Sequence, residues 1–112
     1  MLVPLTFRDK NDFPYQRDGA EVLWAEAAGQ NCILHFEDGS AEAWGYPLCA
    51  FHKKVWEINS FRRLDRFILA KVLRIQKRRW LNALFLNGFV LPLSRKANKR
   101  LKMYFKNHIP AE

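Results

Sequence analysis

The chain has 112 residues and a formal net charge of +8, and 49% of its residues are hydrophobic. This length argues for one domain spanning residues 1–112, and the apolar content suffices for a packed core, which excludes a disordered tail. The charge is uneven, because residues 1–52 hold three basic and eight acidic residues whereas residues 53–112 hold 16 basic and three acidic residues. Such segregation favours a cationic face toward a polyanion, either nucleic acid or an anionic membrane.

The sequence also limits the compartment and the chemistry. It has no apolar run of 18 residues, and its first ten residues lack the basic start and apolar centre of a signal peptide, so we expect a cytoplasmic protein with reduced cysteines. No Ser/His/Asp or Cys/His set and no phosphate-binding loop is recognisable. We therefore expect no enzyme activity, no cofactor and no small-molecule substrate.

Short strand patterns recur through the first half, over residues 5–9, 13–16, 21–27, 32–37 and 40–46. Asp38-Gly39 separates the last two and predicts a two-residue hairpin turn. Pro47 then suits the first turn of a short helix that should end near residues 59–60. The apolar face of that helix would be Leu48, Phe51, Val55 and Ile58.

Residues 61–80 fit two patterns. Apolar residues recur at helical spacing among cations, at Phe61, Leu64, Ile68, Val72 and Ile75, which predicts a basic amphipathic helix. Alternation and β-branched or aromatic content in the same segment also fit a strand. Local pattern leaves both interpretations open.

The C-terminal third combines a hairpin with a basic helix. Asn87-Gly88 lies between the apolar runs 81–86 and 89–93 and predicts a second two-residue turn. Ser94 is placed to cap a helix with the apolar stripe Ala97, Leu101, Tyr104 and Phe105. With the first half, these elements predict a mainly β fold with two short helices and short antiparallel sheets.

Three motifs, in order along residues 5–106, resemble the LytTR family of bacterial DNA-binding domains. The stretch VLWAEAAGQNCILHFEDGSA is similar to the family's opening strands, FRRLDRFILAKVLRI to its central motif, and LFLNGFVLPLSRKANKRL to its Asn-Gly and Ser-Arg motif. The second stretch departs from the family at Asp65, Phe67 and Lys71, which replace the usual His, Ser and Asn.

The resemblance implies an elongated fold in which loops enter successive major grooves of duplex DNA, and it assigns residues 67–76 to strand. Carried over by motif, the base-contacting positions are Gln30, Arg66 and Arg95, side chains that can bond base edges bidentately. Nearby groups would hold phosphates, at Arg62, Arg63, Lys71, Ser94, Lys96 and Lys99. The implied function is a sequence-specific transcription regulator that occupies direct-repeat sites as two copies. Without a receiver domain, its control would come from expression level or a regulatory protein partner.

The sequence also fits two other functions and contains one metal-like spacing. A basic amphipathic segment over residues 61–80 would instead bind a membrane surface or a partner, and aromatic residues with cations would suit a single-strand binder. Cys32 and His35 are three apart, as are Cys49 and His52, a spacing that resembles metal sites. Residues three apart on a strand face opposite sides, so Cys32 and His35 would not both bind a metal easily, and we expect no metal. The four tryptophans are expected to pack in the core or on a sheet.

Overall fold

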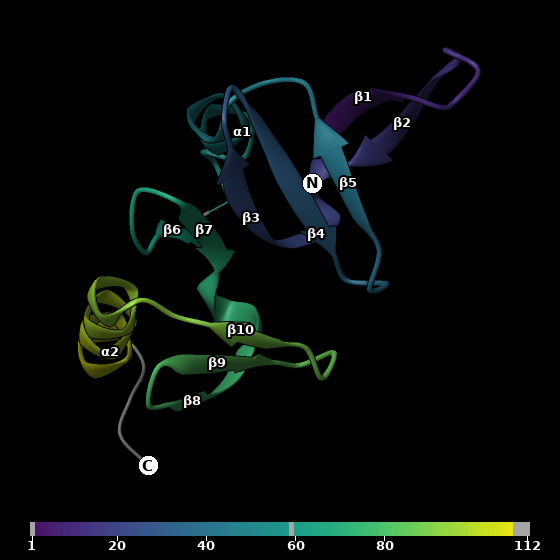
Figure 1. Ribbon diagram of the computed structural model, residues 1–112. Coiled ribbons are helices and arrows are strands. Elements are labelled where there is room, and N and C mark those ends of the chain that lie inside the picture. The colour runs from purple at the N-terminus through teal and green to yellow at the C-terminus, as the bar shows by residue number, and fades with distance from the viewer. Residues whose placement is uncertain (1, 59, 109–112) are drawn as a thin grey trace.

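The computed structural model describes residues 2–58 and 60–108, and its strands form three antiparallel sheets in an elongated molecule (Figure 1). The principal extents are 49 × 28 × 24 Å. Ten short strands and two α-helices occupy the described residues, which confirms the predicted mainly β fold class.

The largest sheet has five strands in the order β5-β4-β3-β7-β6. Its strands are β3 (Val22–Ala28), β4 (Asn31–Phe36), β5 (Ala41–Trp44), β6 (Phe61–Arg63) and β7 (Ile68–Lys71). Helix α1 (Leu48–Lys54) packs on it through Leu48 and Phe51. The hairpin of β1 (Pro4–Arg8) and β2 (Pro14–Asp18) forms a separate two-stranded sheet.

A third sheet, in the order β10-β9-β8, carries the C-terminal helix. Its strands are β8 (Ile75–Arg79), β9 (Asn82–Phe85) and β10 (Val90–Pro92), followed by α2 (Arg95–His108). Short 3₁₀ turns at Gly19–Glu21 and Val72–Arg74 precede β3 and β8. In Figure 1 this sheet and α2 lie below the five-stranded sheet.

The buried side chains form two hydrophobic clusters. The first joins the β1–β2 hairpin, α1 and the five-stranded sheet, and the second joins the three-stranded sheet to α2. The halves meet at Trp24 of β3, whose ring stacks on His35 with centroids 3.7 Å apart and lies 5.6 Å from the ring of Phe89. The molecule thus has two cores that share a seam along β3.

The helical interpretation of residues 61–80 is wrong. Strand β7 lies between β3 and β6, so neighbours on both sides bury most of it and favour a strand over an amphipathic helix. The carboxylate of Asp65 also accepts hydrogen bonds from the backbone N–H groups of Phe67 and Ile68, at 2.8 and 2.9 Å, which stabilises a turn there. The strand assignment implied by the family resemblance is confirmed, with a 3₁₀ turn at Val72–Arg74 interrupting it.

Both predicted hairpins form, but their turns are longer than the two residues expected. In each, a backbone bond closes a three-residue loop, from Phe36 N to Ser40 O and from Phe85 N to Phe89 O, both at 2.9 Å. Only the glycines take positive φ, +88° at Gly39 and +91° at Gly88. This is the pattern of a turn completed by one left-handed residue, in which Asn and Asp need not take positive φ.

Helix α1 is shorter than predicted. It ends at Lys54, and Val55 follows as its C-cap with φ −104°, so the expected end near residues 59–60 is wrong as far as the chain is described, residue 59 lying outside it. The predicted apolar face is nevertheless buried at Leu48, Phe51 and Val55. Helix α2 begins as predicted, because Ser94 Oγ accepts from Ala97 N at 3.0 Å.

Candidate nucleic-acid interface

A hydrogen bond between two turns lies at the centre of the candidate site. Ser94 Oγ, which caps α2, donates to Asp65 Oδ2 in the β6–β7 turn at 2.7 Å. Because the other carboxylate oxygen accepts from Phe67 N and Ile68 N, the Asp65 side chain makes three hydrogen bonds although only 8% of the residue is exposed. The Asp65–Ser94 bond therefore holds Arg66 and Arg95, one residue beyond each partner, on neighbouring turns.

The β6–β7 turn is also braced by Arg63. Its guanidinium donates to the carbonyl oxygens of Asp65, at 2.9 Å, and Arg66, at 2.5 Å. Arg100 of α2 donates in turn to the Arg63 carbonyl oxygen at 3.5 Å. Arg63 therefore fixes the backbone of the turn that carries Arg66, and Arg100 links β6 to α2.

The side chains of Arg66 and Arg95 are exposed and have no carboxylate within ion-pair distance among the residues that the structure describes. The Arg66 guanidinium lies 4.7 Å from the ring centroid of Phe67, whose residue is half exposed. A cation over an aromatic face is favoured by the ring quadrupole, so Phe67 gives Arg66 a preferred position. Phe67, which departs from the family pattern, thus helps to position the side chain of Arg66.

Gln30 lies at the same end of the five-stranded sheet. It belongs to the exposed turn between β3 and β4, beside Gly29 at φ +64°. Strands β3 and β7 are antiparallel, and Ala27 N donates to Phe67 O at 2.8 Å, which brings the β3–β4 turn toward the β6–β7 turn. The structure therefore gathers the three turns that carry Gln30, Arg66 and Arg95.

The predicted phosphate contacts separate into two groups. Lys96 and Lys99 are exposed on α2. Arg62 and Arg63 flank the β6–β7 turn, with the Arg62 guanidinium 5.6 Å from the Tyr104 ring centroid. These four cations surround the Asp65–Ser94 bond from two elements.

Lys71 does not join them. Only 8% of the residue is exposed, and its ammonium donates to the carbonyl oxygen of Ala20 and lies 5.5 Å from the Phe61 ring centroid. Burial lowers the pKa of Lys71. Ser94 is exposed, but its hydroxyl already donates to Asp65 and accepts from Ala97, so one lone pair remains.

A titratable group lies beside the cationic turn. His52 of α1 lines a cavity of about 370 Å³ with Trp56, Phe61, Arg62 and Arg63. Burial lowers the pKa of His52, and the positive charges of Arg63 and Arg62 lower it further. Neutralisation of those two arginines by a bound anion should therefore raise the pKa of His52.

The tryptophans and cysteines divide between core and surface. Trp24 and Trp44 are buried, as predicted, but the expectation is wrong for Trp56 and Trp80, which are 72% and 70% exposed. Trp80 follows β8 and lines an open groove of about 490 Å³ with Arg95, Asn98, Lys99 and Lys102. Cys32 is buried in the first core while His35 stacks on Trp24, so these two side chains face opposite sides of β4 as predicted.

Comparison with known proteins supports the fold and little else. No protein-family model matches the chain, and no curated protein matches it. Among solved structures, the chain is similar to a LytTr DNA-binding domain from Bacillus cereus, with a TM-score of 0.66 over 93% of this chain and 94% of that chain. The identity is 17%, so the likeness concerns the fold. The chain has the fold of a LytTr DNA-binding domain, as the three sequence motifs predicted.

Proposed function

We propose that the chain is a sequence-specific duplex DNA-binding transcription regulator that reads bases with loop residues. The observation that carries this proposal is the Asp65–Ser94 hydrogen bond. It holds Arg66 and Arg95 on neighbouring turns, and neither has a carboxylate within ion-pair distance among the described residues. Arg66 and Arg95 would each donate two hydrogen bonds to guanine O6 and N7, and Gln30 would bond the N6 and N7 edge of adenine. The likeness to a LytTr DNA-binding domain supports the same assignment.

The dimensions of the molecule suit successive major grooves. Its long axis of 49 Å corresponds to about 14 base pairs at roughly 3.4 Å each, or close to one and a half turns of duplex. The β3–β4 turn, the β6–β7 turn and the start of α2 would approach the grooves together, from the face on which they are gathered. Arg62, Arg63, Lys96 and Lys99 would neutralise the phosphates between them, with Ser94 adding one hydrogen bond. Lys71 is left out of this interface, because its ammonium is directed to Ala20.

A membrane-surface function is less well supported. That alternative required an amphipathic helix over residues 61–80, and the described chain forms strands there. No helix in residues 2–58 and 60–108 has the length and apolarity to cross a bilayer. Single-strand binding is the other alternative, because the exposed Trp80 lies beside Lys99 and would offer a stacking platform for a base. A comparison of duplex with single-stranded DNA distinguishes this alternative from duplex binding.

The first test is the salt dependence of binding. If the chain contacts about 4–6 phosphates, the logarithm of its affinity for duplex DNA should fall with the logarithm of salt concentration with a slope of about −4 to −5. Fluorescence anisotropy with a labelled duplex measures the salt slope, and the same assay with the separated strands measures the affinity for single-stranded DNA. A slope near zero, or tighter binding to single strands, would exclude the proposed mechanism.

The second test separates base reading from phosphate binding. Arg66→Ala and Arg95→Ala should each weaken binding to a selected cognate duplex by about 1–3 kcal/mol and barely change binding to random duplex. Lys99→Ala, the control, should weaken both about equally. Circular dichroism checks the fold of each variant. Equal losses on cognate and random DNA for both arginines would reduce them to phosphate contacts.

We further propose that two copies bind a direct repeat, so that neighbouring copies lie on one face of the duplex. Insertion of about half a helical turn, roughly five base pairs, between the half-sites should then weaken joint occupancy. Footprinting on a spacing series measures this. Unchanged occupancy would show that the copies bind independently.

A further inference from the structure

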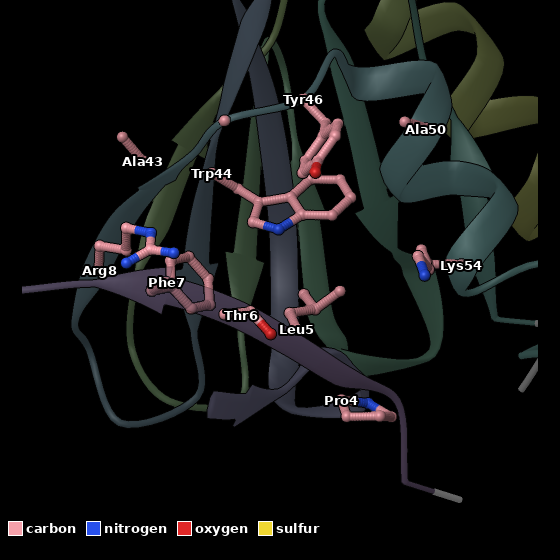
Figure 2. A pocket seen from close by; sticks show the side chains of 11 residues that line it. Pro4, Leu5, Thr6, Phe7, Arg8, Ala43, Trp44, Tyr46, Ala50 and Lys54 are labelled. Carbon is pink, nitrogen blue, oxygen red and sulfur yellow. The ribbon is translucent and has the colours of Figure 1, made fainter. Parts of the chain in front are cut away.

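An open groove lies between β1, β5 and α1 (Figure 2). It has a volume of about 860 Å³. All of β1, Pro4–Arg8, forms one wall, and Ala43–Tyr46, at the end of β5 and just beyond it, forms another, with Ala50 and Lys54 of α1 completing it. In Figure 2, β1 runs below Trp44 and Tyr46, and α1 lies to their right.

The groove exposes the unpaired edge of β1. Backbone bonds from Asp9 N to Phe13 O and from Gly19 N to Val3 O fix the phase of the β1–β2 ladder. In an antiparallel pair the hydrogen-bonded residues alternate, so Leu5 and Phe7 direct their backbone groups to β2 while Thr6 and Arg8 direct theirs away from it. Within the described chain β1 has no second neighbour in a sheet. The N–H groups of Thr6 and Arg8 are therefore available to an added strand.

The opposite wall has a free edge too. In the β4–β5 hairpin, the bond from Phe36 N to Ser40 O sets the phase, so Glu42 and Trp44 pair with β4 and the backbone of Ala43 points outward. Strand β5 is the outer strand of its sheet. Exposed strand edges are templates for pairing with another chain unless they are covered.

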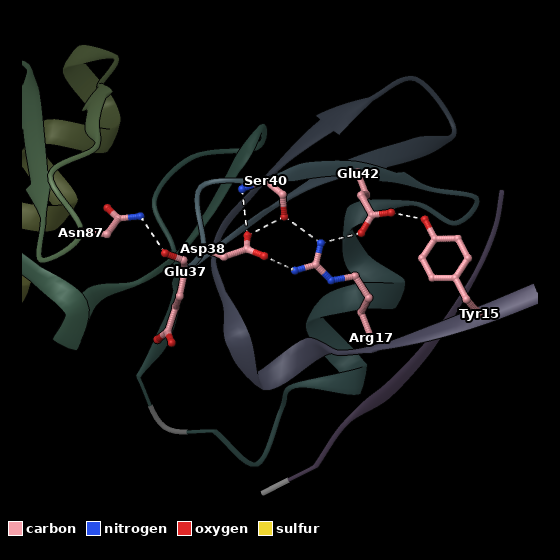
Figure 3. A network of polar contacts seen from close by, with 7 residues as sticks. All are labelled: Tyr15, Arg17, Glu37, Asp38, Ser40, Glu42 and Asn87. Atoms are coloured by element: carbon pink, nitrogen blue, oxygen red, sulfur yellow. Dashed lines mark hydrogen bonds and ion pairs between the residues drawn. The ribbon is translucent and has the colours of Figure 1, made fainter. Parts of the chain in front are cut away.

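A polar network joins β2 of the β1–β2 hairpin to the β4–β5 hairpin (Figure 3). Arg17 of β2 donates to Glu42 and Ser40 at 2.7 Å and to Asp38 at 3.0 Å, while Tyr15 donates to Glu42. The Arg17 guanidinium also lies 3.6 Å from the ring centroid of Phe36. Strand β2 is thus fixed against the β4–β5 hairpin, and β1 is left with its outer edge toward the groove.

The lining of the groove has a definite chemistry. Tyr46 is 57% exposed and offers an apolar surface, and it lies over the buried Trp44, whose ring centroid is 4.7 Å away. The charged residues among its eleven lining residues are Arg8 and Lys54, both cationic. Arg8 forms an exposed ion pair with Asp12 at 3.6 Å and donates to the Asp12 carbonyl oxygen at 2.9 Å, and such exposed contacts are weak. The groove is therefore cationic, although residues 1–52, which supply all of its lining except Lys54, carry a net charge of −5.

We propose that this groove binds an extended, acidic segment of another protein, which adds to the outer edge of β1 as a β-strand. The main chain of the segment pairs with Thr6 and Arg8, alternate apolar side chains pack on Tyr46, and carboxylates meet Arg8 and Lys54. Strand addition of this kind takes affinity from main-chain bonds and specificity from alternate side chains. The proposal goes beyond DNA binding and does not depend on it.

The probe is a phage library of random nonapeptides, selected on the full chain without DNA. Enriched peptides should alternate apolar residues with Asp or Glu. The best peptide, made synthetically and fluorescently labelled, should bind Thr6→Pro about tenfold more weakly, since proline removes one outward N–H. The matched control Thr6→Val keeps that N–H and should bind within about twofold of the natural chain. Lys54→Ala should lose affinity at low salt, whereas Lys53→Ala, on the same helix but outside the groove, should not.

Hydrogen exchange of the natural chain tests the pairing without any variant. The bound peptide should slow exchange of the Thr6 and Arg8 amides, which remain exchangeable in the free protein. Failure to enrich any peptide, unchanged exchange at both amides, or equal affinity of a folded Thr6→Pro variant would overturn the proposal. A concentration-dependent dimer in sedimentation that Thr6→Pro abolishes would also overturn it, by assigning the edge to a second copy of the chain.

Discussion

Removal of the Asp65 carboxylate should damage both stability and sequence reading. Its three hydrogen bonds, to Phe67 N, Ile68 N and Ser94 Oγ, span 2.7–2.9 Å. A hydrogen bond to a charged group contributes about 1.5–3 kcal/mol, but the N–H groups of an exposed turn regain water after truncation, so the three contributions do not add in full. Asp65→Ala should therefore lower the free energy of unfolding by about 2–4 kcal/mol.

Asp65→Asn is the matched control, because it keeps an acceptor for the two backbone N–H groups and removes the charge. It should cost about 1 kcal/mol. Urea denaturation measures both losses, and thermal melts should shift by roughly 4 °C for each kcal/mol in a chain of this size. A double-mutant cycle of Asp65→Asn with Ser94→Ala should give a coupling energy of about 1 kcal/mol or more, since the two side chains are in direct contact.

The same variants test the proposed joining of the two turns. Asp65→Asn removes a negative charge from a cationic surface, so affinity for random duplex should stay the same or rise slightly. Affinity for cognate duplex should fall about tenfold, because Arg66 and Arg95 lose their fixed relation. If Asp65→Ala were as stable as the natural chain, or if it discriminated cognate from random DNA equally well, the argument from this hydrogen bond would be refuted.

Three further predictions rest on buried or shielded groups. Burial raises the pKa of the Cys32 thiol to about 11 from a model-compound value of 9.0, so the thiol's stabilisation is complete below pH 9 and is lost as the pH rises toward 11. Between pH 9 and 11 the free energy of unfolding of the natural chain should then fall by about 1.4 kcal/mol per pH unit more than that of Cys32→Ala. Urea denaturation measures both, and the same pH dependence in the two proteins would contradict this prediction. Lys71→Met should leave the salt slope of DNA binding unchanged, whereas Lys99→Ala should reduce it by about 1; a reduced slope for Lys71→Met would return Lys71 to the interface. The pKa of His52, lowered by burial and then by Arg63 and Arg62, should rise when duplex phosphates neutralise these arginines, and an NMR titration that finds no rise on DNA binding would argue against contact there.

Local sequence patterns predicted the hairpins and helices whose determinants lie within a few residues. The glycines at 39 and 88 and the capping Ser94 each act through short-range backbone geometry, so their elements could be placed from sequence. The turn length could not, because Asn87 and Asp38 permit two-residue and three-residue loops alike. Residues 61–80 could not be assigned locally either, since β7 becomes a strand through pairing with β3 and β6, its partners on either side.

The sequence predicted which residue types form the candidate site, but not the hydrogen bonds that join its turns. Motif resemblance pointed to Arg66 and Arg95, and the structure brings their turns together. Asp65 was recognisable only as a departure from the family pattern, and nothing in the sequence indicated a partner 29 positions away at Ser94. Lys71 illustrates the converse, because its place in the central motif gave no sign that its ammonium would be directed inward to Ala20.

The two hydrophobic clusters allow the halves of this protein to change separately. The first cluster supports the groove through Leu5, Phe7 and Trp44, and the second supports the start of α2 through Ala97 and Leu101. Substitutions that share no partners add nearly independently in their effects on stability. A lineage could therefore change residues at the β1 edge while the start of α2 stayed constant, or change α2 without disturbing the groove. The stack of Trp24, His35 and Phe89 belongs to both halves, and changes there would have to satisfy both at once.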